Sequence, residues 1–360
     1  MMTHHSLKRQ QGVALVTALL ITAMATVIAV SLMSRQYVDV ARTGNMMAAD
    51  QTYLYGLAVE TTALELLGLY IQNNAYDDPD GEMYKPYVFE QEGAMVNGQL
   101  SDLEGRFNLN SLVKPGGSGE WVLNPDQRER FVRLLDNVMQ QLQFSGVSAD
   151  DLANAVVDWL DTDSQATMGG AEDGDYMSLA DVQYRAANRL MTSASELNMV
   201  MGFDRELLYG KTINDQFEPG LLRYVAALPQ TDTTININTA DKKVIKAMSS
   251  YFTDAAVDAL VAHRGDPAVA PFKDTGEFTG HQAITDILED LKKKNDDKGQ
   301  KAFEKDYATG WDVKSHYYLV TTHAQLGKTT TVLNSLLYRD AKANANRLVA
   351  LSRSMGTDGI

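Results

Sequence analysis

The hydrophobic pattern of the chain is dominated by one long apolar segment near the N-terminus. Residues 13–33 read VALVTALLITAMATVIAVSLM, 21 positions without a charge. As an α-helix this segment would be roughly 31 Å long, which matches the hydrocarbon core of a bilayer. The pattern therefore predicts a membrane helix. Lys8 and Arg9 precede it, and because positive residues favour the cytoplasmic side, we expect the larger C-terminal part to be exported.

A glycine, Gly12, stands immediately before the apolar segment. A secretory signal has its small-residue cleavage site after the apolar region, so cleavage at Gly12 would leave the membrane helix on the protein. A short basic leader that ends in glycine and precedes a long apolar helix resembles the class III signal cleaved by prepilin peptidase. The resemblance implies a leader at 1–12 and a scissile bond between Gly12 and Val13. An uncleaved single-pass anchor is the alternative.

Helical and strand patterns follow the membrane segment. Residues 34–70 contain no proline and repeat apolar positions at helical spacing, so we expect the membrane helix to continue through them. The stretch 73–85 has the composition of a loop. Two hairpins are then predicted about 200 residues apart, one with its turn at Asn97–Gly98 and one around Gly327.

The region between the two hairpins is mostly helical in pattern, and its two parts resemble each other. The motif FNLNSL at 107–112 precedes one group of helical stretches, and ININTA at 235–240 precedes another. The simplest arrangement is an α+β fold in which the long N-terminal helix packs on an antiparallel sheet that is interrupted by a large helical insertion. The expected divisions are a leader at 1–12, a transmembrane helix at 13–33, a discontinuous sheet domain at 34–112 and 315–344, helical subdomains at 113–230 and 231–314, and a flexible tail at 345–360.

An acidic segment lies in the first of these helical regions. Its carboxylates, with no lysine or arginine among them, are Asp158, Asp161, Asp163, Glu172, Asp173 and Asp175. Such a concentration of negative charge is repulsive unless a cation compensates it, and hard oxygen ligands in a glycine-containing loop suit calcium. An EF-hand is not expected, because Ala166 stands where that loop requires glycine. A solvated acidic loop that caps helix ends is the alternative.

The composition excludes several classes of function. The formal net charge of −15 argues against a general nucleic-acid binder, because phosphates would be repelled. The 360 residues include no cysteine, which excludes disulfides, thiolate metal sites and a cysteine nucleophile. The six histidines form no catalytic or metal-binding motif. We therefore expect that the protein is not an enzyme.

Three segments, together with the N-terminus, resemble the K-type minor pseudopilins of type II secretion systems, the general secretion pathway protein K family. They are LEGRFNLNSL at 103–112, WLDTDSQATMGGAEDGDY at 159–176 and ININTADKKVIKAM at 235–248. The resemblance implies a pilin-like fold with an insertion of two SAM-like helical subdomains. It also implies a structural calcium ion held by Asp161, Asp163, Glu172 and Asp173, with Asp158 and Asp175 as further candidates.

Thr17 agrees with this resemblance. Most pilins have glutamate at the fifth mature position, where its carboxylate can pair with the terminal ammonium of a neighbouring subunit. This chain has Thr17 there, and the K-type proteins resemble it in lacking the glutamate. A subunit at a filament tip has no subunit above it whose ammonium needs a partner, so the threonine and the bulk of the insertion favour a tip position.

The function that the resemblance implies is assembly rather than catalysis. The protein is expected to be a non-enzymatic minor pseudopilin that supports protein export across the outer membrane. A single helix would hold it in the bacterial inner membrane, with the bulk of the chain in the periplasm. Its expected partners are other minor pseudopilins in a tip complex, the inner-membrane secretion platform, and prepilin peptidase, which would expose an N-terminus for methylation.

Two other functions stay open on the sequence. A minor pilin of a type IV pilus would share the leader and the helix but need not contain the doubled helical insertion. Residues 235–264 also resemble a helix-hairpin-helix DNA-binding module, which would suit a membrane-anchored DNA-uptake protein. The hairpin of that module normally carries a glycine pair near the backbone phosphate, and here it reads SSYFTD.

Overall fold

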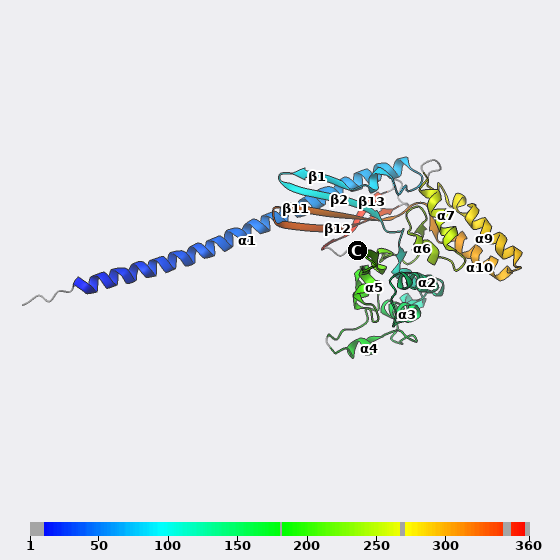
Figure 1. The fold of residues 1–360 in the computed structure, drawn as a ribbon, viewed down its shortest axis with the longest axis horizontal. Helices are drawn as coiled ribbons and strands as arrows, with labels where there is room; N and C mark the ends of the chain where they lie inside the picture. The colour runs from blue at the N-terminus through cyan, green and yellow to red at the C-terminus, as the bar shows by residue number, and fades with distance from the viewer. Residues whose placement is uncertain (1–10, 181, 267–270, 341–346, 357–360) are drawn as a thin grey trace, which may run out of the picture.

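A computed structural model describes residues 11–180, 182–266, 271–340 and 347–356 of the chain. Helix α1 runs without a break from Gln11 to Asn73, and its N-terminal half extends away from the rest of the molecule (Figure 1). The predicted membrane segment and the residues after it therefore form one helix, as the absence of proline indicates. Most of the expected leader lies outside the described residues.

The C-terminal half of α1 lies along a five-stranded sheet (Figure 1). The strand order is β1-β2-β11-β12-β13, and every neighbouring pair is antiparallel. The strands are β1 (Tyr87–Gln91), β2 (Ala94–Asp102), β11 (Tyr317–Leu326), β12 (Thr329–Asp340) and β13 (Arg347–Met355). Val59 and Leu67 of α1 are buried against Val96 and Val320 of the sheet. The predicted α+β fold, with a long helix on an antiparallel sheet, is confirmed.

One of the two predicted turns is wrong. Asn97 and Gly98 lie inside β2, and the chain reverses instead at Glu92 and Gly93, whose φ angles are 51° and 78°. Two successive residues with positive φ are the geometry of a two-residue hairpin turn. Glycine is required at position 98 by packing rather than by a turn, because a Cβ atom there would lie 2.5 Å from Cγ1 of Val59 on α1. The second turn is confirmed, since Gly327 separates β11 from β12.

The C-terminal region contains a strand that the sequence pattern did not predict. We expected a flexible tail at 345–360, but residues 347–355 form β13 and pair with β12. Exposed and half-buried positions do not alternate regularly along this strand, so its pattern carries little signal. A tertiary contact fixes it instead: the Arg353 guanidinium donates two hydrogen bonds of 2.7 Å to the carboxylate of Glu60 on α1. Gly356 follows the strand, and its N–H donates a 3.2 Å hydrogen bond to the carbonyl oxygen of Val332. The other residues of the expected tail, 345, 346 and 357–360, lie outside the described part of the chain.

The helical insertion leaves the sheet after β2 and returns at β11 (Figure 1). Its α-helices are α2 (Pro125–Gln141), α3 (Ala149–Leu160), α4 (Asp173–Met177), α5 (Arg205–Tyr209), α6 (Lys242–Ala247), α7 (Asp254–Arg264), α8 (Thr275–Thr279), α9 (Gln282–Lys293) and α10 (Asp297–Ala308). Its short strands are β3 (Phe107–Asn108), β4 (Val113–Pro115), β5 (Trp121–Leu123), β6 (Gly210–Ile213), β7 (Gln216–Pro219), β8 (Val225–Ala226), β9 (Ile235–Asn236) and β10 (Trp311–Asp312). The 3₁₀ helices are η1 (Glu82–Tyr84), which precedes β1, and η2 (Leu109–Leu112), η3 (Gly117–Gly119), η4 (Ala194–Met199) and η5 (Leu221–Arg223) in the insertion.

The two motifs FNLNSL and ININTA form equivalent structures. Each begins with a short strand that pairs in parallel with a distant segment, β3 with β8 and β9 with β10. The side chain of the first asparagine accepts a hydrogen bond from the N–H two residues later, in Asn108 and in Asn236 alike. The second asparagine bonds both backbone groups of one distant residue. These pairs are Asn110 with Met191 and Asn238 with Phe272. The weak sequence repeat therefore corresponds to a repeated structural unit.

Candidate metal centre and assembly surfaces

The predicted acidic site lies between helices α3 and α4. Asp158 is in the last turn of α3, and Asp161 is the residue that caps the C-terminus of this helix. Glu172 is the N-cap of α4, where its side chain accepts a hydrogen bond from the N–H of Asp173. The loop that joins the two helices therefore returns the start of α4 to the end of α3.

Three carboxylates converge at this point. One oxygen from each of Asp161, Asp163 and Glu172 lies within 4.8 Å of the other two. Asp161 and Glu172 are only 6% and 5% exposed, whereas Asp163 is exposed. Asp158, one turn earlier on α3, is fully buried. The cluster is thus largely withdrawn from water but keeps one carboxylate, that of Asp163, at the surface.

Three buried carboxylate oxygens in this region receive no hydrogen bond. They are Oδ1 of Asp158, Oδ1 of Asp161 and Oε1 of Glu172. The other oxygen of Asp158 accepts a 3.0 Å hydrogen bond from the N–H of Thr167, so only part of each carboxylate is satisfied by the protein. Leaving a buried anionic oxygen without a donor is costly. The arrangement therefore fits a cation that supplies the missing interactions.

Burial and mutual repulsion change the acidity of these groups. Burial is the largest cause and raises the pKa of Asp161 to about 7, with further contributions from the negative charges beside it. Burial likewise raises the pKa values of Asp158 and Glu172. A bound cation would favour the ionised forms and reverse these shifts.

Two glycines allow the loop to lie against α3. Gly169 has a φ angle of 83°, and a Cβ atom on Gly170 would overlap the carboxylate of Asp158. Asn154 of α3 donates a 2.8 Å hydrogen bond from Nδ2 to the carbonyl oxygen of Met168. The loop can reverse direction and lie close to α3 because these two glycines have no side chain.

The structure gives Asp173 and Asp175 other partners. Oδ1 of Asp173 accepts a 3.1 Å hydrogen bond from the N–H of Ala186, and Oδ2 lies 3.3 Å from Nη1 of Arg185. Oδ2 of Asp175 accepts a 2.9 Å hydrogen bond from the N–H of Glu172, which completes a capping box at the start of α4. The cluster of three converging oxygens includes neither residue. Their role as ligands stays a prediction.

Two contacts that sequence reasoning missed connect the acidic site to other parts of the insertion. Thr162, which stands between two of the acids, receives a 3.2 Å hydrogen bond from the N–H of Trp121 on β5. The ring of Trp159 packs edge-on against Tyr176 of α4, with centroids 5.3 Å apart. Each contact joins residues that are distant in the sequence, so no local motif predicts it.

The ligand chemistry of the cluster is that of a hard cation. Its donors are carboxylate oxygens, and the chain contains no cysteine. Calcium accepts six to eight such oxygens, including backbone carbonyls and water, in a flexible geometry. The site can therefore fasten the end of α3 to the start of α4 by a shared ion.

Helix α1 provides a second candidate functional surface. Among the described residues it is the one helix long and apolar enough to cross a membrane, and its apolar segment is not covered by the rest of the chain. The hydroxyl group of Thr17 lies 3.0 Å from the carbonyl oxygens of Val13 and Ala14, so its own helix satisfies it. Thr17 thus needs no partner from a neighbouring subunit.

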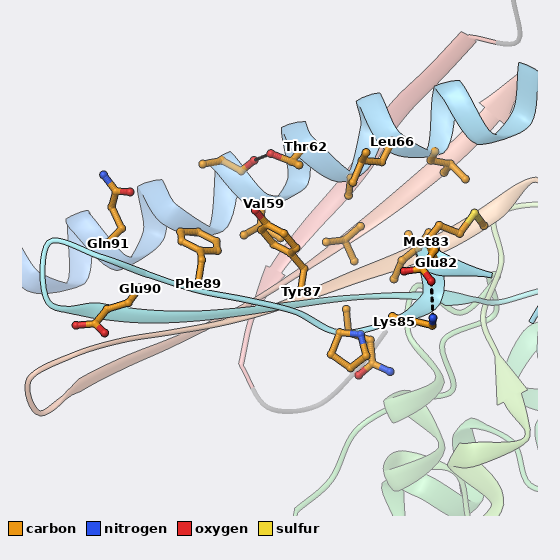
Figure 2. Close-up of a pocket in the computed structure, with 18 residues that line it drawn as sticks. Val59, Thr62, Leu66, Glu82, Met83, Lys85, Tyr87, Phe89, Glu90 and Gln91 are labelled. Atoms are coloured by element: carbon orange, nitrogen blue, oxygen red, sulfur yellow. Dashed lines mark hydrogen bonds and ion pairs between the residues drawn. The ribbon is translucent and has the colours of Figure 1, made fainter. Parts of the chain in front are cut away.

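A groove of about 520 Å³ lies between α1 and the β1–β2 hairpin (Figure 2). Val59 and Leu66 of α1 and Phe89 of β1 form part of its lining, and Figure 2 shows Phe89 on the side of β1 that faces α1. Glu82 and Lys85 at one end pair with each other at 2.5 Å. The groove therefore offers a mainly apolar surface for contact.

Two lysines of the helices that resemble a DNA-binding module are paired with carboxylates. Nζ of Lys242 lies 2.5 Å from Asp258, and Nζ of Lys246 lies 2.5 Å from Asp254. Phosphate groups would have to compete with these carboxylates. The structure therefore does not favour the DNA-uptake alternative.

Fold and site together define a class: an α+β protein with a long apolar N-terminal helix, an interrupted sheet and an acidic helical insertion. Two family models, both described as type II secretion system (T2SS), protein K, match residues 105–230 and 235–296. Type II secretion system protein K of Pectobacterium carotovorum subsp. carotovorum is 33% identical, over 71% of this chain and 76% of its own. The protein of the same name from Pseudomonas aeruginosa is 29% identical, over 98% of this chain and 94% of its own. The chain belongs to the family of type II secretion system protein K.

A solved structure has the same fold. It is a chain of the GspK-GspI-GspJ complex from the enterotoxigenic Escherichia coli type 2 secretion system. The TM-score is 0.67 at 23% sequence identity, and the match covers 88% of this chain and 99% of the other. The likeness extends to almost the whole of that chain, so the insertion belongs to the shared architecture.

Proposed function

We propose that this protein is a minor pseudopilin that assembles at the tip of the type II secretion pseudopilus and supports protein export across the outer membrane. The observation that carries the proposal is the continuous helix α1, whose exposed apolar half leads directly into a half that packs on the sheet. A helix of this kind can be held in a bilayer first and packed beside similar helices afterwards. The role is structural and requires no catalytic group.

The membrane anchor is proposed to be residues 13–33, with the N-terminus in the cytoplasm and the bulk of the chain in the periplasm. Prepilin peptidase would cleave between Gly12 and Val13, and the new N-terminus would be methylated. Supporting this assignment, Gly12 precedes the apolar run and Lys8 and Arg9 lie before it.

The tip position is supported by bulk and by Thr17. Helices α7, α9 and α10 lie at the end of the molecule opposite to the N-terminal half of α1 (Figure 1). An insertion of this size would crowd subunits stacked above it, and Thr17 leaves no carboxylate for the ammonium of such a subunit. The fold neighbour comes from a GspK-GspI-GspJ complex, so we propose other minor pseudopilins and the inner-membrane platform as partners. The groove between α1 and β1 is a suitable surface for such lateral contacts.

The acidic site is proposed to hold a structural calcium ion. Asp161, Asp163 and Glu172 would be its ligands, with the buried Asp158 close enough to add charge. When bound, the ion supplies positive charge and coordination to oxygens that the protein leaves unsatisfied. The protein residues position these oxygens at the ends of α3 and α4. The helical parts of the insertion are further proposed to be SAM-like subdomains.

The experiment that tests the pseudopilin assignment is the mass and N-terminal residue of the membrane-extracted protein, produced with and without prepilin peptidase. We expect an N-terminus at Val13 only when the peptidase is present. A protein that keeps Met1 whether or not the peptidase is present would exclude the pseudopilin assignment and leave an uncleaved membrane anchor. A variant with Gly12→Leu is the matched control, because it should stay unprocessed while the membrane helix is unchanged.

A further inference from the structure

Three segments meet where the helical insertion rejoins the sheet. Asp77 follows α1 and is only 2% exposed. Its N–H donates a 2.8 Å hydrogen bond to the carbonyl oxygen of Val313. Its Oδ2 accepts hydrogen bonds from Nδ2 of Asn236 at 2.9 Å and from the N–H of Ser315 at 2.7 Å. Through its carboxyl group and its N–H, Asp77 therefore joins the end of α1 to the start and the end of the second helical part, residues 235–313, and to Ser315 just after it.

The other oxygen of Asp77, Oδ1, has only a long contact with a donor that also bonds elsewhere. Oδ1 lies 3.5 Å from the hydroxyl oxygen of Tyr318, which is itself fully buried. The hydroxyl hydrogen of Tyr318 is used in a 2.9 Å hydrogen bond to the carbonyl oxygen of Ser315. Oδ1 is therefore the atom that can carry a proton, with the lone pairs of the Tyr318 oxygen in front of it.

A second carboxyl group joins the same parts of the molecule. Asp102 ends β2, and its Oδ1 accepts a 2.8 Å hydrogen bond from the N–H of Glu104. Its Oδ2 accepts a short hydrogen bond from the hydroxyl group of Thr239 in the second helical part. The two carboxyl groups thus act on one junction from α1 and from β2.

The surroundings of the two carboxyl groups contain charges of both signs. The titratable and charged groups that face them or their neighbours are Glu104, Arg106, Arg339, His316, Tyr70, Tyr84 and Tyr318. The arginines keep their charge throughout the physiological pH range. Burial, and after it the negative charge of Asp102, raises the pKa of Asp77 to about 7. Burial raises the pKa of Asp102 to about 6.

We propose that Asp77 and Asp102 make a proton-controlled junction, which holds the second helical part on the sheet when they are protonated and loosens when they ionise. Ionisation brings the charge of the buried Asp77 into repulsion with that of the half-buried Asp102, and opening relieves this repulsion by admitting water. His316 acts in the same direction. Its hydrogen bond to Glu104 raises its pKa, so loss of its proton at higher pH leaves the buried Glu104 carboxylate without that cation.

The sign of the effect follows from proton binding. The closed junction keeps the Asp77 proton up to pH about 7, whereas an open, solvated aspartate loses it near its ordinary value of 3.8. Closure therefore binds a proton, and the closed state is favoured at low pH and lost as pH rises through 7. For Asp77 alone, opening should become about 10- to 100-fold more frequent between pH 5 and pH 8.

Hydrogen exchange on the full chain in detergent, between pH 5 and pH 8, tests the proposal. After correction for intrinsic exchange rates, we expect protection of the amides at 235–240 and 313–316 to fall by about 10- to 100-fold as pH rises. Asp77→Asn imitates the protonated acid, because its Nδ2 can stand where Oδ1–H would be. The pH dependence of its protection should be much smaller than in the unmodified chain, with only the contributions of Asp102 and His316 left. Asp80→Asn, at an exposed position of the same loop, is the matched control and should behave like the unmodified chain.

Protection that does not depend on pH in the unmodified chain would overturn the proposal. A pH dependence in Asp77→Asn as large as that of the unmodified chain would overturn the assignment to Asp77. If that variant does not fold, Asp102→Asn provides a second comparison, since it removes the neighbouring charge that raises the pKa of Asp77. We then expect the midpoint of the protection change to move to lower pH, and an unchanged midpoint would contradict the coupling of the two acids.

Discussion

Asp161 and Glu172 are nearly buried carboxylates that each keep one oxygen without a hydrogen-bond donor. Their neighbours are acids rather than lysines or arginines, so repulsion within the protein is not compensated by its own cations. Burial of this kind is unfavourable unless a cation is shared. The loop geometry therefore has a physical reason to depend on metal binding.

Removal of single ligands tests this reasoning. We expect Asp161→Asn and Glu172→Gln each to weaken calcium binding by about 100-fold or more, because each removes a charged ligand from a site built of few. Isothermal titration of the full chain in detergent measures the affinity. Asp173→Asn is the informative comparison, since the structure assigns its carboxylate to Ala186 and Arg185. A loss as large as that of Asp161→Asn would make Asp173 a ligand.

Gly170 allows a second prediction at this scale. Gly170→Ala should destabilise the first helical part by about 1–3 kcal/mol, because its Cβ atom would overlap the Asp158 carboxylate and push the loop from α3. Thermal unfolding followed by circular dichroism measures the change. Gly174→Ala is the control, since a Cβ atom there meets no atom within 4 Å. Equal effects of the two variants would contradict the packing argument.

At the scale of elements, an ion pair joins β13 to α1. Glu60 is 4% exposed and accepts hydrogen bonds from Arg353 and from Ser335. Burial favours the neutral acid, but the hydrogen bonds from Arg353 and Ser335 outweigh it and hold the pKa of Glu60 below its ordinary value. The contribution of this pair to stability is therefore present above pH 4.5 and is lost as pH falls through the lowered pKa.

Arg353→Leu should remove that contribution and destabilise the sheet by about 1–3 kcal/mol at pH 7, because the Glu60 carboxylate stays buried without its cation. Between pH 5 and pH 3, the free energy of unfolding of the variant should therefore fall less than that of the unmodified chain. Urea unfolding at a series of pH values measures both effects. Arg347→Leu, on the same strand and with an exposed side chain, is the control. An unchanged stability of Arg353→Leu would show that β13 is held by other contacts.

At the scale of the whole molecule, the acidic site affects more than its own loop. Asp173, next to Glu172, accepts a hydrogen bond from the N–H of Ala186, and Thr162, between Asp161 and Asp163, accepts one from the N–H of Trp121 on β5. An ion at this site would therefore stabilise segments on both sides of α3.

Calcium removal is expected to lower the stability of the insertion by about 3 kcal/mol when the ion is supplied at 100 times its dissociation constant. Thermal unfolding of the full chain with calcium and with a chelator measures the difference. Asp161→Asn should unfold at the same temperature in both conditions. A chelator that has no effect on the unmodified chain would exclude a structural calcium ion.

The sequence by itself determined the features that local pattern controls. Twenty-one uncharged residues without proline specify the apolar half of α1, the turn at Gly327 follows from its neighbours, and the acidic segment is a matter of composition. The tertiary structure decided what depends on distant residues. It assigned Gly98 to close packing with Val59 rather than to a turn, and fixed β13 through Glu60. It also buried Asp77 beside Asn236, because contacts between segments remote in the chain leave no period or motif in the sequence.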